Sequence, residues 1–137
     1  MRRTLNYLLT AFMMTTVASG CATKIQTATD APALGSDAEI IAKKGKTGNY
    51  EISVTITNLA PAARLDESAT AFVVWVLQKD QAPVRAGALD YDEGDRSGAL
   101  QVTSPDPSFT ILVTLEETVT ATSPGGKRIL EQAVAVR

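Results

Sequence analysis

Residues 50–57 (YEISVTIT) and residues 70–78 (TAFVVWVLQ) are the two stretches that decide the fold. The first alternates apolar and polar side chains at every second position, which is typical of a strand with one buried face. The second is apolar on both faces and rich in β-branched residues, which favours a central strand. No segment has a sustained helical period, so the two stretches point to an all-β domain.

Similar segments continue the pattern on both sides of these stretches, separated by turns rich in Gly, Pro and charged residues. The remaining predicted strands are residues 38–43, 84–91, 98–103, 109–116 and 128–136. Residues 84–91 and 98–103 should form a hairpin around the charged segment 92–97. About seven strands at these spacings predict one antiparallel, immunoglobulin-like sandwich. Trp75 is expected in its core, and a ligand-stacking surface is the alternative for that side chain.

The first twenty residues have the pattern of a secretory signal peptide. Arg2 and Arg3 give a positive start, residues 7–17 are mostly apolar, and the small residues Ala18, Ser19 and Gly20 follow. The apolar run is too short to cross a bilayer as a mature helix. We therefore expect residues 1–20 to be removed.

The only cysteine stands directly after these small residues, and Ala18-Ser19-Gly20-Cys21 resembles the lipobox of bacterial lipoproteins. The resemblance implies that the Cys21 thiol and the new amine are acylated and anchor the protein in the envelope membrane. An ordinary cleavage site with a free cysteine is the alternative, but an unpaired cysteine is unusual in a secreted chain. Ala22 is not the aspartate that retains Gram-negative lipoproteins in the inner membrane. In a Gram-negative bacterium, Ala22 therefore implies that the protein is anchored in the outer membrane and faces the periplasm.

Residues 22–36 are rich in Ala, Thr, Pro and Gly and show no apolar period. This composition predicts a flexible tether with a root-mean-square span of about 20 Å. The expected organisation is a signal peptide over residues 1–20, a lipidated cysteine and tether over 21–36, and a β-sandwich over 37–137.

Four segments of the second half, taken in order, resemble the extracytoplasmic domain of anti-sigma-K-type factors. They are residues 72–77 (FVVWVL), 82–89 (APVRAGAL), 111–116 (ILVTLE) and 123–130 (SPGGKRIL). The resemblance implies a sandwich on the outer side of a membrane. The family's zinc-binding region, with its His and paired Cys, has no counterpart in the sequence, so sigma-factor binding is not implied.

The composition disfavours several functions. The 137 residues include no His and one Cys, and the formal net charge is −2. Histidine is the commonest general base and metal ligand, and phosphate binding needs a basic face. We therefore expect no enzyme activity, no cofactor and no nucleic-acid partner.

Two charged clusters have possible ligands. Carboxylates at Asp90, Asp92, Glu93 and Asp95 surround Gly94 and could offer oxygens to Ca²⁺, but their spacing departs from an EF-hand loop. A solvated hairpin tip explains them better, and a small-ligand or weak Ca²⁺ site at Asp90, Asp92 and Asp95 is the alternative. A second cluster, formed by three lysines, could contact anionic lipid headgroups. Charged residues in a turn also keep a strand edge soluble, and the sequence alone favours this second explanation. These lysines are Lys43, Lys44 and Lys46.

The sequence thus predicts a non-catalytic, membrane-anchored envelope lipoprotein whose sandwich serves as a protein-interaction or accessory module. Its envelope protein partner is unknown. The expected contact surfaces are the loops at residues 58–68 and 104–108, or an edge strand.

Overall fold

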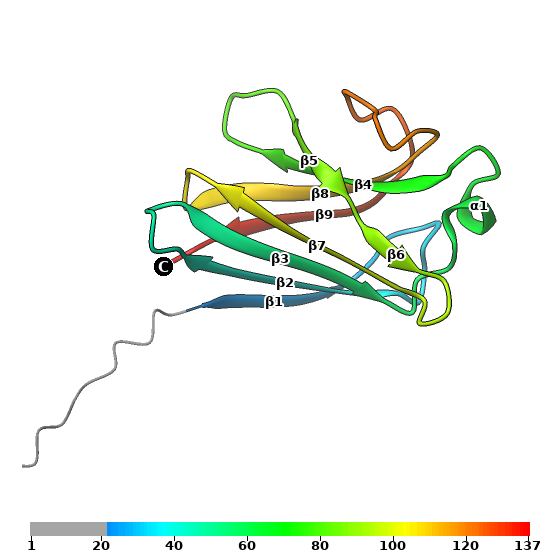
Figure 1. Ribbon diagram of the computed structural model, residues 1–137, viewed down its shortest axis with the longest axis horizontal. Helices are drawn as coiled ribbons and strands as arrows, with labels where there is room; N and C mark the ends of the chain where they lie inside the picture. Colours follow the sequence, from blue (N-terminus) through cyan, green and yellow to red (C-terminus); the bar gives the residue numbers. More distant parts are fainter. Residues whose placement is uncertain (1–21) are drawn as a thin grey trace, which may run out of the picture.

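The computed structural model describes residues 22–137 and shows two antiparallel sheets packed face to face (Figure 1). The described residues form nine strands and one short helix. The first sheet has the order β1-β2-β3-β7-β6 and the second the order β5-β4-β8-β9. The strands of the first sheet are β1 (Thr23–Ala28), β2 (Asp37–Lys44), β3 (Tyr50–Thr57), β7 (Ser97–Ser104) and β6 (Asp90–Asp92). Those of the second are β5 (Val84–Ala88), β4 (Ala71–Leu77), β8 (Ser108–Glu116) and β9 (Arg128–Ala135).

The main core lies between the sheets. The alternation predicted for residues 50–57 is confirmed, because Ile52, Val54 and Ile56 are buried while Glu51 is exposed. The facing side chains come from β4, β8 and β9, and Phe72 of β4 is among the largest of them. Residues 22–137 contain nine paired strands and a hydrophobic core between the two sheets, so this segment carries what a folded domain requires.

Strand β1 replaces the flexible tether predicted for residues 22–36. It pairs with β2 from Thr23 opposite Ala42 to Ala28 opposite Asp37. Its side chains alternate between half-buried and exposed, and Ile25 packs against the core. Ile25 is its only large apolar residue, so the polar composition concealed a strand that the edge of β2 stabilises by backbone hydrogen bonds. The prediction of a tether was wrong for this segment.

The predicted hairpin of residues 84–91 with 98–103 forms only in part. Its first half is β5, which pairs with β4 in the other sheet, while β6 pairs with β7. The chain passes between the sheets at Leu89, which is buried and whose N–H donates to the Phe72 carbonyl at 2.8 Å. This split and the unexpected β1 account for nine strands in place of about seven. The connection at 58–68 also contains a one-turn helix, α1 (Ala62–Leu65).

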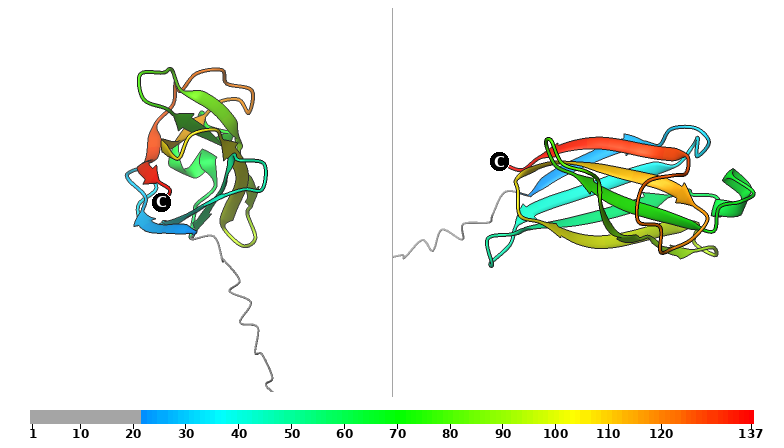
Figure 2. Two further views of the ribbon diagram at one scale, coloured as in Figure 1. Left: turned by 90° about the vertical axis from the view of Figure 1, so that its left-hand side faces the viewer. Right: turned by 90° about the horizontal axis from the view of Figure 1, so that it is seen from above.

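Strand direction gives the sandwich two ends with different loops (Figures 1 and 2). The proximal end holds Ala22, the β2–β3 turn, the β4–β5 loop, the β7–β8 turn and the last two residues. The distal end holds the loops at 29–36, 58–70, 93–96 and 117–127. In the described part of the chain, no helix has the length and apolar character needed to cross a bilayer.

Candidate functional site

Trp75 is fully buried in an apolar core cluster, which confirms the prediction, but this cluster is not the one between the sheets. Because side chains alternate along β4, Phe72, Val74 and Val76 face the main core, whereas Trp75 lies on the opposite face of the sheet. There it forms a second apolar cluster with Ala71, Val73 and Leu112, against which Ala121 of the 117–127 loop packs. Its burial leaves no ring face for stacking a ligand.

A chain of hydrogen bonds connects Trp75 to the 117–127 loop. The indole Nε1–H donates to Thr114 Oγ1 at 2.9 Å, and the Thr114 hydroxyl donates to Glu116 Oε1 at 2.7 Å. The same oxygen accepts the N–H groups of Gly125 and Gly126 at 3.0 and 3.1 Å. Glu116 therefore fixes the glycine turn onto the sheet. The sequence signal was the two-residue spacing of Thr114 and Glu116, which places both on one face of a strand.

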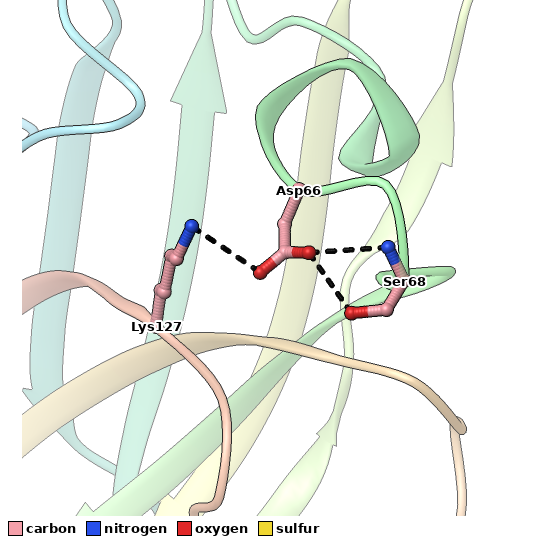
Figure 3. A network of polar contacts seen from close by, with 3 residues as sticks. All are labelled: Asp66, Ser68 and Lys127. Atoms are coloured by element: carbon pink, nitrogen blue, oxygen red, sulfur yellow. Dashed lines mark hydrogen bonds and ion pairs between the residues drawn. The ribbon is translucent and has the colours of Figure 1, made fainter.

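A shallow groove of about 640 Å³ at the distal end brings Asp66, Glu116 and Glu117 together with Lys127. Asp66 Oδ1 accepts hydrogen bonds from the Ser68 N–H and hydroxyl at 3.1 and 2.9 Å, and Lys127 Nζ lies 3.6 Å from Oδ2 (Figure 3). The Ser68 hydrogen bonds, assisted by Lys127, lower the pKa of Asp66 below its ordinary value. These contacts join the 58–70 loop to the 117–127 loop.

Tyr91 of β6 organises the other side of the distal end. Its hydroxyl donates to the Leu59 carbonyl at 2.6 Å, and its ring packs 5.4 Å from that of Phe72. Burial raises the pKa of the phenol above its ordinary value. The Leu59 N–H in turn donates to the Arg96 carbonyl at 2.8 Å, so β6 and the β6–β7 turn hold the 58–70 loop in place.

The acidic residues predicted as a weak Ca²⁺ site lie on β6 and its turn. Asp90, Asp92 and Asp95 are all exposed, and Asp92 Oδ1 accepts the Asp95 N–H at 3.1 Å, which closes the turn. Within residues 22–137, no three His, Cys, Asp or Glu side chains gather closely enough to hold a metal ion. The observed role of Asp92 is to shape the turn.

The three lysines of the predicted basic turn lie at the proximal end and are exposed. Lys43 Nζ is 3.6 Å from Glu51 Oε2, while Lys44 and Lys46 have no ion-pair partner among the described residues. Because Thr23 pairs with Ala42, the described chain begins beside Lys43. Cys21, the predicted lipid attachment site, lies outside the described residues.

The two predicted contact loops lie at opposite ends of the sandwich, so they cannot form one surface. Residues 58–68 are distal and 104–108 are proximal. A hollow of about 1100 Å³, open to solvent, borders β3, β5 and β7. Its single carboxylate is Glu51, already paired with Lys43, so it offers no pair of acids.

Comparison with known proteins adds no assignment. No protein-family model matches the sequence, and no significant match was found among curated proteins or solved structures.

Proposed function

We propose that this chain is a non-catalytic lipoprotein of a bacterial envelope, anchored through Cys21, whose sandwich acts as a protein-interaction or accessory module. The observation that carries the proposal is the position of the only cysteine. It follows a positive start, an apolar run and three small residues, and only Ala22 separates it from β1. One acyl chain binds a membrane only marginally, whereas several give stable anchoring.

The distal end is the surface we assign to a protein partner. A lipid at Cys21 would hold the proximal end at the membrane, which leaves the distal loops facing outward. Leu34 and Val119, two of the exposed large apolar side chains, belong to these loops, with 76% and 51% of their surface accessible. Exposed apolar residues surrounded by polar ones are typical of contact surfaces.

The finer features of the fold belong to the same proposal. We propose an immunoglobulin-like architecture, with which the two antiparallel sheets agree. The resemblance to the anti-sigma-K extracytoplasmic domain stays a proposal that rests on the order of the four sequence segments. The outward position of Trp75 differs from the inter-sheet tryptophan of immunoglobulin domains.

The anchor is tested by expressing the full chain and its Cys21→Ser variant in a bacterium. Membranes are then fractionated, and the mass of the N-terminal peptide is measured by mass spectrometry. We expect the wild-type peptide to begin at Cys21 with added acyl mass, and the variant to leave the membrane fraction. Ser19→Ala, which keeps a small residue, is the matched control and should behave as wild type. A variant that stays membrane-bound would overturn the lipid anchor.

The partner surface is tested by placing a photo-crosslinking residue at Leu34 or Val119, with Lys79 at the proximal end as the control position. We expect the same envelope protein to be captured from both distal positions and not from Lys79. Capture of lipid alone at all three positions would contradict the assignment.

A further inference from the structure

The proximal end of the sandwich has its own ligand chemistry. We propose that it is a membrane-docking face, in which Lys43, Lys44 and Lys46 contact anionic lipid headgroups. The orientation rests on the proposed lipid anchor at Cys21, whereas the binding of the lysines to an anionic surface does not. The proposal gives the β2–β3 turn a role beyond keeping a strand edge soluble.

The first argument is the distance between the anchor and the sheet. Since β1 begins at Thr23, only Ala22 lies between Cys21 and a strand that is hydrogen-bonded along its length to β2. Two residues extend at most about 7 Å. A lipidated chain would therefore hold its proximal end against the headgroups, with no room for the tether that the sequence predicted.

The second argument is the position of the lysines. Register places Ala42 opposite Thr23, so the three lysines follow immediately at the end of β2 that lies beside the start of β1. The β2–β3 turn projects from this end of the sandwich (Figure 2). Lys44 and Lys46 have no ion-pair partner in the described part of the chain, so their ammonium groups are available to a phosphate.

The third argument is that the fold separates charge of opposite sign. The proximal segments 43–51, 78–83, 105–107 and 136–137 carry five basic and three acidic side chains, and one of the acids, Glu51, is paired with Lys43. The distal loops 29–36, 58–70, 93–96 and 117–127 carry six acidic and three basic ones. Strands of this length separate the two ends by about 25 Å, or some three Debye lengths at physiological ionic strength. An anionic membrane at the proximal end would therefore interact with a positively charged face, although the net charge of the protein is negative.

The binding is tested on residues 22–137, the segment that carries its own core. We would measure co-sedimentation with vesicles of equal phosphatidylglycerol and phosphatidylcholine, and with phosphatidylcholine alone, at an ionic strength of about 0.1 M. Each lysine near an anionic surface raises partitioning about fivefold. Lys43→Gln/Lys44→Gln/Lys46→Gln should thus lower binding to the anionic vesicles at least about tenfold.

The matched control neutralises the three basic residues of the distal loops, in the variant Arg64→Gln/Arg96→Gln/Lys127→Gln. It has the same net charge as the proximal variant, and its binding should stay within about threefold of wild type because its changes lie beyond the screening length. Equal losses in the two variants, or no preference of the wild-type segment for anionic vesicles, would overturn the proposal.

The orientation is tested on the full chain, purified from bacterial membranes and reconstituted into the same vesicles. Labelling by an amine-reactive reagent should be slower at Lys44 and Lys46 in anionic than in neutral vesicles, and unchanged at the distal Lys127. Equal labelling of all three would refute the docked orientation. If the N-terminal peptide carries no acyl mass, the anchor fails, and the co-sedimentation experiment still decides whether the lysines bind anionic lipid.

Discussion

Replacing Glu116 by leucine tests the hydrogen-bond network behind the second apolar cluster. Glu116 is 6% exposed and its Oε1 accepts three hydrogen bonds, from the Thr114 hydroxyl and from the N–H groups of Gly125 and Gly126. Leucine has a similar size and accepts none of them. The variant therefore removes the acceptor with little change in volume.

The expected loss follows from the surroundings of each donor. The Thr114 hydroxyl is buried, so leaving it without an acceptor costs about 1–3 kcal/mol. The two glycines are exposed, so water can replace the carboxylate at their N–H groups and the loss there is about 1 kcal/mol in total. We expect the free energy of unfolding to fall by about 3 kcal/mol. Glu116→Gln keeps an acceptor oxygen and should lose about 1 kcal/mol, the difference between charged and neutral hydrogen bonds.

Urea denaturation of residues 22–137 measures these differences, with the fluorescence of Trp75, the only tryptophan, as the probe. For a domain of this size the Glu116→Leu midpoint should shift by about 2 M. Glu117→Leu is the matched control, because Glu117 is the next residue and is exposed. Its stability should stay within about 0.5 kcal/mol of wild type. If Glu116→Leu were no less stable than Glu117→Leu, the network would have no role in holding the loop.

Four further variants test the distal end by denaturation. Gly126→Ala should lose at least about 2 kcal/mol, because its Cβ would lie 1.5 Å from a carbonyl oxygen of β8, while Gly125→Ala has only a contact at 3.8 Å and should be mild. Tyr91→Phe should lose about 1 kcal/mol at neutral pH with its hydrogen bond to Leu59. Because burial raises the pKa of this phenol, Tyr91 ionises at lower pH in the unfolded chain than in the folded one, which favours unfolding. The stability difference between wild type and Tyr91→Phe should therefore shrink above pH 10.0. The pKa of Asp66 is lowered, so the ionised carboxylate stabilises the fold at pH values above its ordinary pKa of 3.8, and this stabilisation is lost as the pH falls below that value. The difference in unfolding free energy between wild type and Asp66→Asn should therefore disappear in acid.

The sequence predicted the central strands well because their patterns are unambiguous. The alternating residues 50–57 and the doubly apolar residues 70–78 correspond to β3 and β4, and β4 is a central strand as predicted, with β5 and β8 on either side. What covers the outer face was not predictable, because the 117–127 loop has no apolar period and is held by a carboxylate and two glycine N–H groups. Trp75 is therefore buried as expected, but in a second cluster beneath this loop that the sequence did not predict.

The split of residues 84–91 between two sheets could not be predicted from the sequence, for a different reason. A continuous strand and two short strands have the same alternation, and only the pairing partners distinguish them. The partners are set by β4, whose register with β5 shifts between Val74 and Trp75, and by Leu89, which inserts into the main core. These are contacts between residues distant in sequence.

Strand β1 shows how one structural element changes a functional prediction. Composition predicted a tether, and a tether would make the charges of the domain irrelevant to the membrane, since about 20 Å exceeds the screening length. With residues 23–28 in the sheet, a lipid at Cys21 would bring the proximal lysines within reach of headgroups. The net charge, which argues against an anionic partner, averages over two ends of opposite sign. The order of the strands, and not the composition, decides which end would meet the membrane.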